Sequence, residues 1–145
     1  MNDVRVTVRA ATEGDAERLA SILTDEGYPA GASDITARLA RFDAIGSHVL
    51  VAEAGGDVVG FIALLVVPRF ETAETFARIV TLVVDAGERE RGIGHLLMTA
   101  AETTATEAGA SFLEVTAGHH RPDARHLFES LGYDSGVATY LRKRR

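Results

Sequence analysis

The fold of this chain is constrained most by a β-rich segment that runs through a short glycine-containing turn directly into a helix. Ala77–Val84 predicts a strand, and a helical stripe of apolar residues starts at Gly92 and ends at Gly109. A further strand is expected over Ser111–Thr116. Two strands joined through a helix form a parallel, right-handed βαβ unit, and the helix N-terminus lies at the carboxyl ends of those strands. Ligands tend to bind at that edge.

The preceding part of the chain predicts one strand and two helices. Alternating residues over Arg5–Arg9 are typical of a half-buried strand. Thr12 is expected to cap a helix that ends near Gly27. A second helix is expected to open at Ser33 and to close before Gly46.

Three more strands and one helix complete the pattern. Strands are expected over His48–Ala54 and Asp57–Val67, on either side of the turn-forming pair Gly55-Gly56. A helix is expected from Pro122 to Gly132, followed by a final strand over Val137–Leu141. The order is β, α, α, β, β, β, α, β, α, β, and a chain of 145 residues is expected to form one domain, residues 1–145.

Composition excludes several functional classes. The chain has no cysteine, which excludes disulfides, zinc ribbons, iron–sulfur clusters and thiol nucleophiles. Fifteen basic against twenty-one acidic residues give a net charge of −6, which argues against nucleic acid and anionic membranes as partners. The start of the sequence has no basic leader followed by an apolar run, and the longest apolar stretch, Val58–Val67, is too short to span a bilayer. A cytoplasmic location is the resulting expectation.

The turn before the expected helix at Gly92 is the candidate binding site. The N–H groups of a first helical turn lack intrahelical acceptors and, with the helix dipole, bind anions. Gly92 and Gly94 let the backbone approach ligand oxygens closely, and Arg89 and Arg91 add positive charge. A diphosphate would fit this turn. The alternative is that the glycines only ease a tight turn and the arginines are solvated.

The turn is neither a Walker A sequence nor a G-x-G-x-x-G fingerprint, but it matches Arg-x-x-Gly-x-Gly from Arg89 to Gly94. In this it resembles the GNAT superfamily of N-acetyltransferases, and the segment Ala124–Tyr133 resembles that family's Ala-x-x-x-Tyr-x-x-x-Gly-Phe/Tyr helix. The resemblance covers nearly the whole chain. It implies an α/β (α+β) fold with a central mixed, mostly antiparallel sheet of about six to seven strands, about four helices on both faces and one parallel βαβ cofactor unit.

The resemblance implies acetyl-CoA as cosubstrate. In the family its pyrophosphate lies on the amides of the turn, and its pantetheine arm pairs with the preceding strand, where a bulge splays that strand from its neighbour. The implied cofactor-binding residues are Leu82, Val83, Val84, Arg89, Glu90, Arg91, Gly92, Ile93 and Gly94.

Candidates for the catalytic groups follow from the chemistry of acetyl transfer. An alkylamine is only about one part in a thousand neutral at pH 7, so a base or a proton-relaying water helps. Glu114 is a lone carboxylate between apolar neighbours and is a candidate base; alternatively it lies on a polar face or pairs with an arginine. His119 and His120 follow the same strand, and His120 is the candidate proton relay, with a solvated loop histidine as the alternative. Adjacent histidines rarely converge on one ion, so no metal is expected.

The sequence also departs from the family. Phe128 stands where many relatives carry a tyrosine that protonates the departing thiolate, and Arg121 stands at the usual asparagine position. Phe128 cannot donate a proton, yet a thiol with a pKa near 8.5 is a tolerable leaving group. Glu71 and Glu74 could attract a cationic acceptor, or they are solvated loop charges.

The resulting hypothesis is an N-acetyltransferase that moves an acetyl group from acetyl-CoA to a primary amine of a small molecule or peptide, by direct attack in a ternary complex. The alternative is a non-catalytic acyl-CoA-binding sensor or partner subunit, and a third reading is another phosphate-containing ligand on the same turn. A homodimer is compatible with the resemblance. Polyamines, aminoglycosides, amino acids and protein N-termini all remain open as acceptors.

Overall fold

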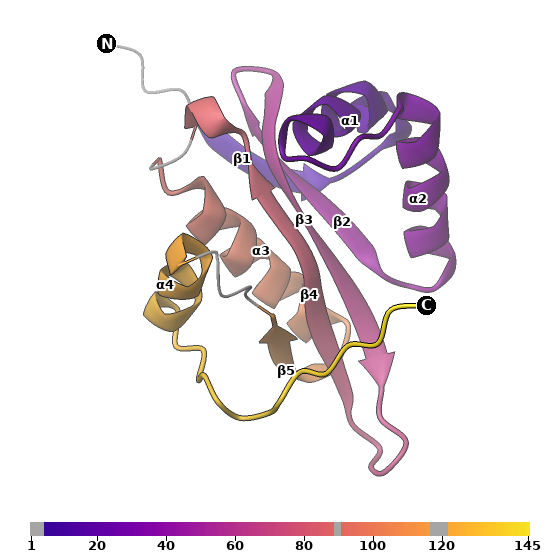
Figure 1. The fold of residues 1–145 in the computed structure, drawn as a ribbon, viewed down its shortest axis with the longest axis vertical. Coiled ribbons are helices and arrows are strands. Elements are labelled where there is room, and N and C mark those ends of the chain that lie inside the picture. Colours follow the sequence, from indigo (N-terminus) through magenta and orange to yellow (C-terminus); the bar gives the residue numbers. More distant parts are fainter. Residues whose placement is uncertain (1–4, 89–90, 117–121) are drawn as a thin grey trace.

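The computed structural model describes residues 5–88, 91–116 and 122–145. Its strands and helices, in chain order, are β1 (Val6–Ala10), α1 (Ala16–Asp25), α2 (Ala32–Ala44), β2 (His48–Ala54), β3 (Asp57–Pro68), β4 (Thr75–Val84), α3 (Ile93–Glu107), β5 (Ala110–Val115) and α4 (Pro122–Ser130). Short 3-10 turns, Glu13–Asp15 and Ala86–Glu88, precede α1 and follow β4. The strands lie side by side in the order β1-β2-β3-β4-β5 (Figure 1).

The sheet is antiparallel except at one edge. β1 through β4 pair antiparallel, whereas β4 and β5 are parallel and are joined through α3. The mixed α/β fold with one βαβ unit is therefore confirmed. The hairpin at Gly55-Gly56 is also present, and both glycines have the positive φ angles, 59° and 85°, that such a turn requires.

The expected strand count of six to seven is too high, because the described part of the chain contains five strands. The expected strand over Val137–Leu141 does not form. A strand is stable only when its backbone pairs with a neighbour and one face is buried. Here the described segment joins no sheet, and Val137 and Leu141 are 81% and 85% exposed.

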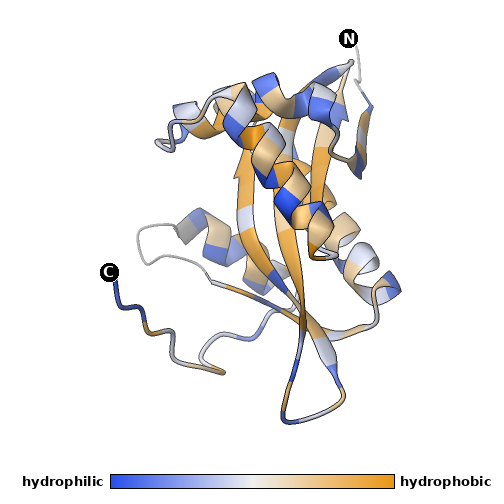
Figure 2. Ribbon diagram, turned by 90° about the vertical axis from the view of Figure 1, so that its right-hand side faces the viewer, coloured by the Kyte–Doolittle hydropathy of each residue, from blue (hydrophilic) through white to orange (hydrophobic). Residues whose placement is uncertain are grey.

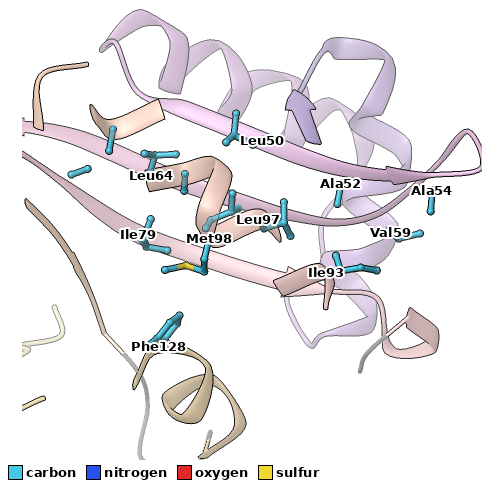
Figure 3. Close-up of a cluster of buried hydrophobic side chains, with 14 residues drawn as sticks. Leu50, Ala52, Ala54, Val59, Leu64, Ile79, Ile93, Leu97, Met98 and Phe128 are labelled. Carbon is cyan, nitrogen blue, oxygen red and sulfur yellow. The ribbon is translucent and has the colours of Figure 1, made fainter. Parts of the chain in front are cut away.

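Helices cover both faces of the sheet and make two hydrophobic cores. α3 and α4 pack on one face, where Leu97, Met98 and Phe128 meet strand residues such as Leu64 and Ile79 (Figure 3). α1 and α2 pack on the other face, against strand residues that include Val51, Phe61 and Val83. Viewed from the side of α2, hydrophobic residues run along the strands behind these helices (Figure 2). None of the helices in the described ranges is long and apolar enough to cross a membrane.

A buried carboxylate fixes the start of α1. Asp15 accepts a hydrogen bond from the Thr12 backbone N–H at 2.8 Å, as expected for a capped helix, and two from Arg9 at 2.9 Å. Arg9 on β1 also pairs with Glu53 on β2 at 2.8 Å. This network ties the first helix to the sheet. The second helix begins at Ala32, one residue before the expected opening at Ser33. Its N-cap is Gly31, whose N–H donates to the Asp34 carboxylate.

The Asp15→Asn variant is expected to lose stability in a pH-dependent way. Hydrogen bonding from Arg9 is the main reason that the pKa of Asp15 lies below its ordinary value. A lowered folded-state pKa means that the stabilisation is complete above the unfolded pKa of about 4 and is lost as pH falls through the lower folded value. We expect a loss of about 2 kcal/mol at pH 7.

Urea unfolding of wild type and variant at pH 7 and at steps down to pH 3 measures this difference. The gap between them should shrink below about pH 4. Glu13→Gln changes an exposed carboxylate in the same turn and is the matched control. A gap that stays constant over the whole pH range would contradict the assignment.

Candidate functional site

The pairing between β4 and β5 ends halfway along β4, at the last residue of β5. In the β3–β4 ladder Leu64 pairs with Ile79 and Ala63 pairs with Thr81, so Val80 is an extra residue that forms a β-bulge. The β4–β5 ladder ends at the pair Ile79–Val115. Beyond this point β4 continues to Val84 paired with β3 alone, and no β-strand of the described residues pairs with its other edge. One edge of β4 is therefore unpaired next to Leu82, where the family resemblance implies that a ligand arm pairs with the strand.

A cavity of about 510 Å³ lies beside this edge. The cavity is lined by Val80–Val83 of β4, by Val115 at the end of β5 and Thr116 after it, and by Phe128 of α4. On the other face of the sheet, the same cavity is lined by side chains of α1, of α2 and of the segment between them. The residues that line the cavity thus come from both faces of the sheet, at the unpaired end of β4 beyond β5.

The turn that follows β4 ends in an exposed helix N-terminus. Gly92 is the N-cap of α3 and has a φ of 77°, a left-handed conformation that favours glycine. The N–H groups of Ile93, Gly94 and His95 precede the first hydrogen bond between turns, Leu96 N–H to the Gly92 carbonyl. A Cβ on Gly92 would meet no atom within 4 Å. Open space and first-turn amides make an anion site physically reasonable here.

Gly94 has a packing role that the motif alone does not reveal. A Cβ on Gly94 would lie 3.1 Å from Cδ2 of Leu127, so the missing side chain lets α4 approach α3 closely. Of the other predicted cofactor-binding residues, Leu82 and Val83 line the cavity, and Val84 packs against the core beneath α3. Arg91 forms an ion pair with Glu88 at the turn. Arg89 and Glu90 lie outside the described residues.

A long-range ion pair holds the end of β4. Arg18 of α1 donates to the Val58 carbonyl and to Asp85 Oδ2, both at 2.8 Å. The backbone N–H of Asp85 donates to the Val59 carbonyl at 2.8 Å. These contacts join α1, β3 and the start of the turn. Sequence analysis missed Arg18, because nothing local marks a partner that lies far along the chain.

Of the two predicted catalytic residues, the structure describes Glu114 but not His120. The Glu114 carboxylate forms an ion pair with Arg78, its neighbour on β4, and Glu114 is not among the residues that line the cavity. This ion pair is the alternative that the sequence leaves open for Glu114. His120, with His119 and Arg121, lies outside the described residues, so its role as a proton relay stays a prediction.

Phe128 does lie at the cavity. It is 7% exposed, and its ring reaches from α4 toward Met98 and Ile79 (Figure 3). Tyr133 packs against it at 6.2 Å between ring centroids and donates a hydrogen bond to Glu102 at 2.8 Å. Burial, and then that hydrogen bond, raise the pKa of Tyr133, so this phenol is fixed in the core as a neutral group.

The remaining acidic candidates are paired away from the cavity. Glu71 and Glu74 both form ion pairs with Arg69 in the loop between β3 and β4. Across residues 5–88, 91–116 and 122–145, no group of three or more His, Cys, Asp or Glu side chains is arranged to hold a metal ion. Sequence analysis also missed Tyr28 and Arg38, which line the cavity from the α1–α2 side.

Comparison with known proteins places this geometry in context. Residues 16–133 match the acetyltransferase (GNAT) family. An uncharacterized N-acetyltransferase of Bacillus subtilis, YhfO, is 31% identical over 145 residues, which cover 93% of this chain and 95% of that protein. A putative acetyltransferase from Agrobacterium tumefaciens is 25% identical, with a TM-score of 0.83 over 95% of this chain and 99% of that chain. A transcriptional regulator from Bacillus halodurans is 26% identical, with a TM-score of 0.82 over 97% of this chain and 100% of that chain.

Proposed function

Because the chain belongs to the GNAT family of acetyltransferases, we propose that it transfers an acetyl group from acetyl-CoA to a primary amine of a small molecule or peptide. The observation that carries the proposal is the cavity at the unpaired end of β4, beyond the last residue of β5, which is lined by residues from both faces of the sheet. Two substrates that enter from opposite faces can meet in such a cavity.

The described residues fit the cosubstrate. Its diphosphate would lie on the first-turn amides of α3, beside Gly92, where a Cβ would meet no atom. Its amide-rich arm would add to the edge of β4 at Leu82 and Val83, which no strand of the described residues covers. The thioester would then lie in the cavity, where Phe128 limits the space on the α4 side.

The reaction requires little from side chains beyond placement. A neutral amine nitrogen attacks the thioester carbonyl carbon, a C–N bond forms, and the C–S bond breaks to release the thiolate of CoA. The amine loses its proton to water or to a base, and the thiolate takes one from water. Phe128 cannot supply that proton, and a thiol pKa near 8.5 makes its absence tolerable. Holding both substrates in one cavity supplies most of the rate enhancement in this scheme.

The Glu114→Gln variant is expected to keep kcat/KM within about 3-fold of wild type, whereas removal of a general base costs about 10²-fold or more. We expect this small effect because the Glu114 carboxylate is paired with Arg78 and does not line the cavity. Arg78→Gln breaks the same pair from the other side and is the matched control, and each variant should change stability by less than about 1 kcal/mol. A 100-fold loss confined to Glu114→Gln, in a folded protein, would instead assign the base to Glu114.

Thermal-shift titration followed by a thiol-release assay tests the proposal. CoA and acetyl-CoA should raise the melting temperature. At a ligand concentration of 100 times Kd, binding stabilises the folded state by about 2.7 kcal/mol. Pyrophosphate and ADP serve as comparison ligands, because a general phosphate site would respond equally to them. Amine-dependent thiol release then identifies an acetyltransferase. If acetyl-CoA stabilises the protein but no amine causes release of the CoA thiol, the result would favour the sensor. That alternative is supported by Phe128 and by the likeness to a protein described as a transcriptional regulator.

A further inference from the structure

The wall of the cavity on the α1–α2 side is predominantly apolar. Leu23 of α1, Leu39 and Phe42 of α2, and Val49 of β2 line it with half-buried side chains. An acceptor that binds here replaces water on these side chains, so an apolar group on the acceptor gains about 25 cal/mol for each Å² that it buries. A strongly hydrated polycation would lose its hydration and gain no compensating contact.

This wall also carries the guanidinium of Arg38, an exposed residue of α2. Arg38 of α2 lines the cavity, and no hydrogen bond or ion pair engages its guanidinium within the described part of the chain. A guanidinium presents a fork of N–H donors that matches a carboxylate in a bidentate arrangement. Tyr28, which also lines the cavity, adds a phenol at the same side.

The charges near the cavity favour an anionic group on the acceptor. No aspartate or glutamate is found among the cavity residues that the structure describes. The acidic residues that sequence analysis considered for a cationic acceptor, Glu71 and Glu74, are paired with Arg69.

On the basis of the proposed function, we infer that the acceptor is a primary amine that carries both a large apolar group and a carboxylate, with the carboxylate bound by Arg38. Hydrophobic amino acids and short peptides that end in one belong to this class. Polyamines and aminoglycosides, which have several ammonium groups and no carboxylate, do not. The inference selects among the four kinds of acceptor that the sequence leaves open.

The test compares acids with their amides. The probes are L-phenylalanine and alanyl-phenylalanine, each with its C-terminal amide, and spermidine and kanamycin as polycations. Thiol release gives KM for each amine in wild type and in Arg38→Gln. Arg41→Gln removes an exposed arginine of the same helix that does not line the cavity, and so it controls for net charge. We expect Arg38→Gln to raise KM for the acids at least 10-fold and to change KM for the amides less than 2-fold, with Arg41→Gln near wild type.

A second measurement does not depend on turnover. Calorimetry with N-acetyl-phenylalanine and its amide, in the presence of CoA, measures binding of the acetylated product, and Arg38→Gln should weaken only the acid. Equal binding of acid and amide, or better turnover of spermidine than of phenylalanine by the wild type, overturns the inference and leaves the proposed function standing. Absence of any CoA binding removes the proposed function itself, and the two failures are therefore distinguishable.

Discussion

The Gly92→Glu variant is expected to lose CoA binding by at least 100-fold while it stays folded. Gly92 is the N-cap of α3, and the space around its Cβ position is open, so the new side chain meets no atom within 4 Å. The carboxylate would occupy the anion position at the helix N-terminus and would repel the diphosphate. The left-handed φ of 77° adds a backbone cost of about 1–2 kcal/mol for any side chain. Calorimetry with CoA measures the loss, and circular dichroism checks the fold.

Gly92→Asn separates charge from backbone strain. Asparagine tolerates the left-handed region better than other side chains do, and it carries no charge. We expect this control to bind CoA within about 10-fold of wild type, since an uncharged amide repels no phosphate. If Gly92→Glu bound CoA as well as Gly92→Asn does, the diphosphate would have to lie elsewhere, and the site assignment would fail.

The Gly60→Val variant is expected to destabilise the fold by about 2–4 kcal/mol, the range of severe packing errors in a core. A Cβ on Gly60 would lie 2.9 Å from the Val83 carbonyl oxygen and 3.3 Å from Cδ1 of Leu97. The first contact is with backbone, which cannot rotate away, so β3 and β4 would have to move apart. Urea unfolding measures the change in free energy.

Gly87→Val is the matched control for this substitution. A Cβ at Gly87 would meet no atom within 4 Å, and its φ is not in the positive range. The same change of residue should therefore cost less than about 0.5 kcal/mol there. Equal losses at the two positions would mean that valine destabilises through the unfolded chain rather than through the close approach at Gly60.

Local patterns were enough to predict most of the fold. Three local patterns each predict one element that depends mainly on residues close in the sequence. They are the β-rich run at Ala77–Val84, the helical stripe after Gly92 and the paired glycines of the hairpin. The strand expected over Val137–Leu141 failed because pairing decides whether such a segment becomes a strand, and no partner for it exists in the described structure.

In the candidate site too, local features were predictable from the sequence and long-range contacts were not. The turn before α3 was predictable, because its glycines and its place after a strand are adjacent in the sequence. The contact of Arg18 with Asp85 and the place of Arg38 on the cavity wall were not, because each depends on how distant elements pack. Glu114 looked like an isolated carboxylate only as long as its cross-strand neighbour Arg78 was unknown.

The single inserted residue at Val80 also reverses which face of the sheet each later side chain of β4 meets. Before it, Ala77 and Ile79 face the core beneath α3; after it, Leu82 and Val84 face that core and Val83 faces the core beneath α1 and α2. Odd positions and even positions have exchanged roles. A regular strand over the same sequence would place Leu82 and Val84 beneath α1 and α2, so the pattern of β4 requires the bulge. Deleting Val80 would remove the bulge and leave every following side chain on its present face, so the bulge can be tested without disturbing either core.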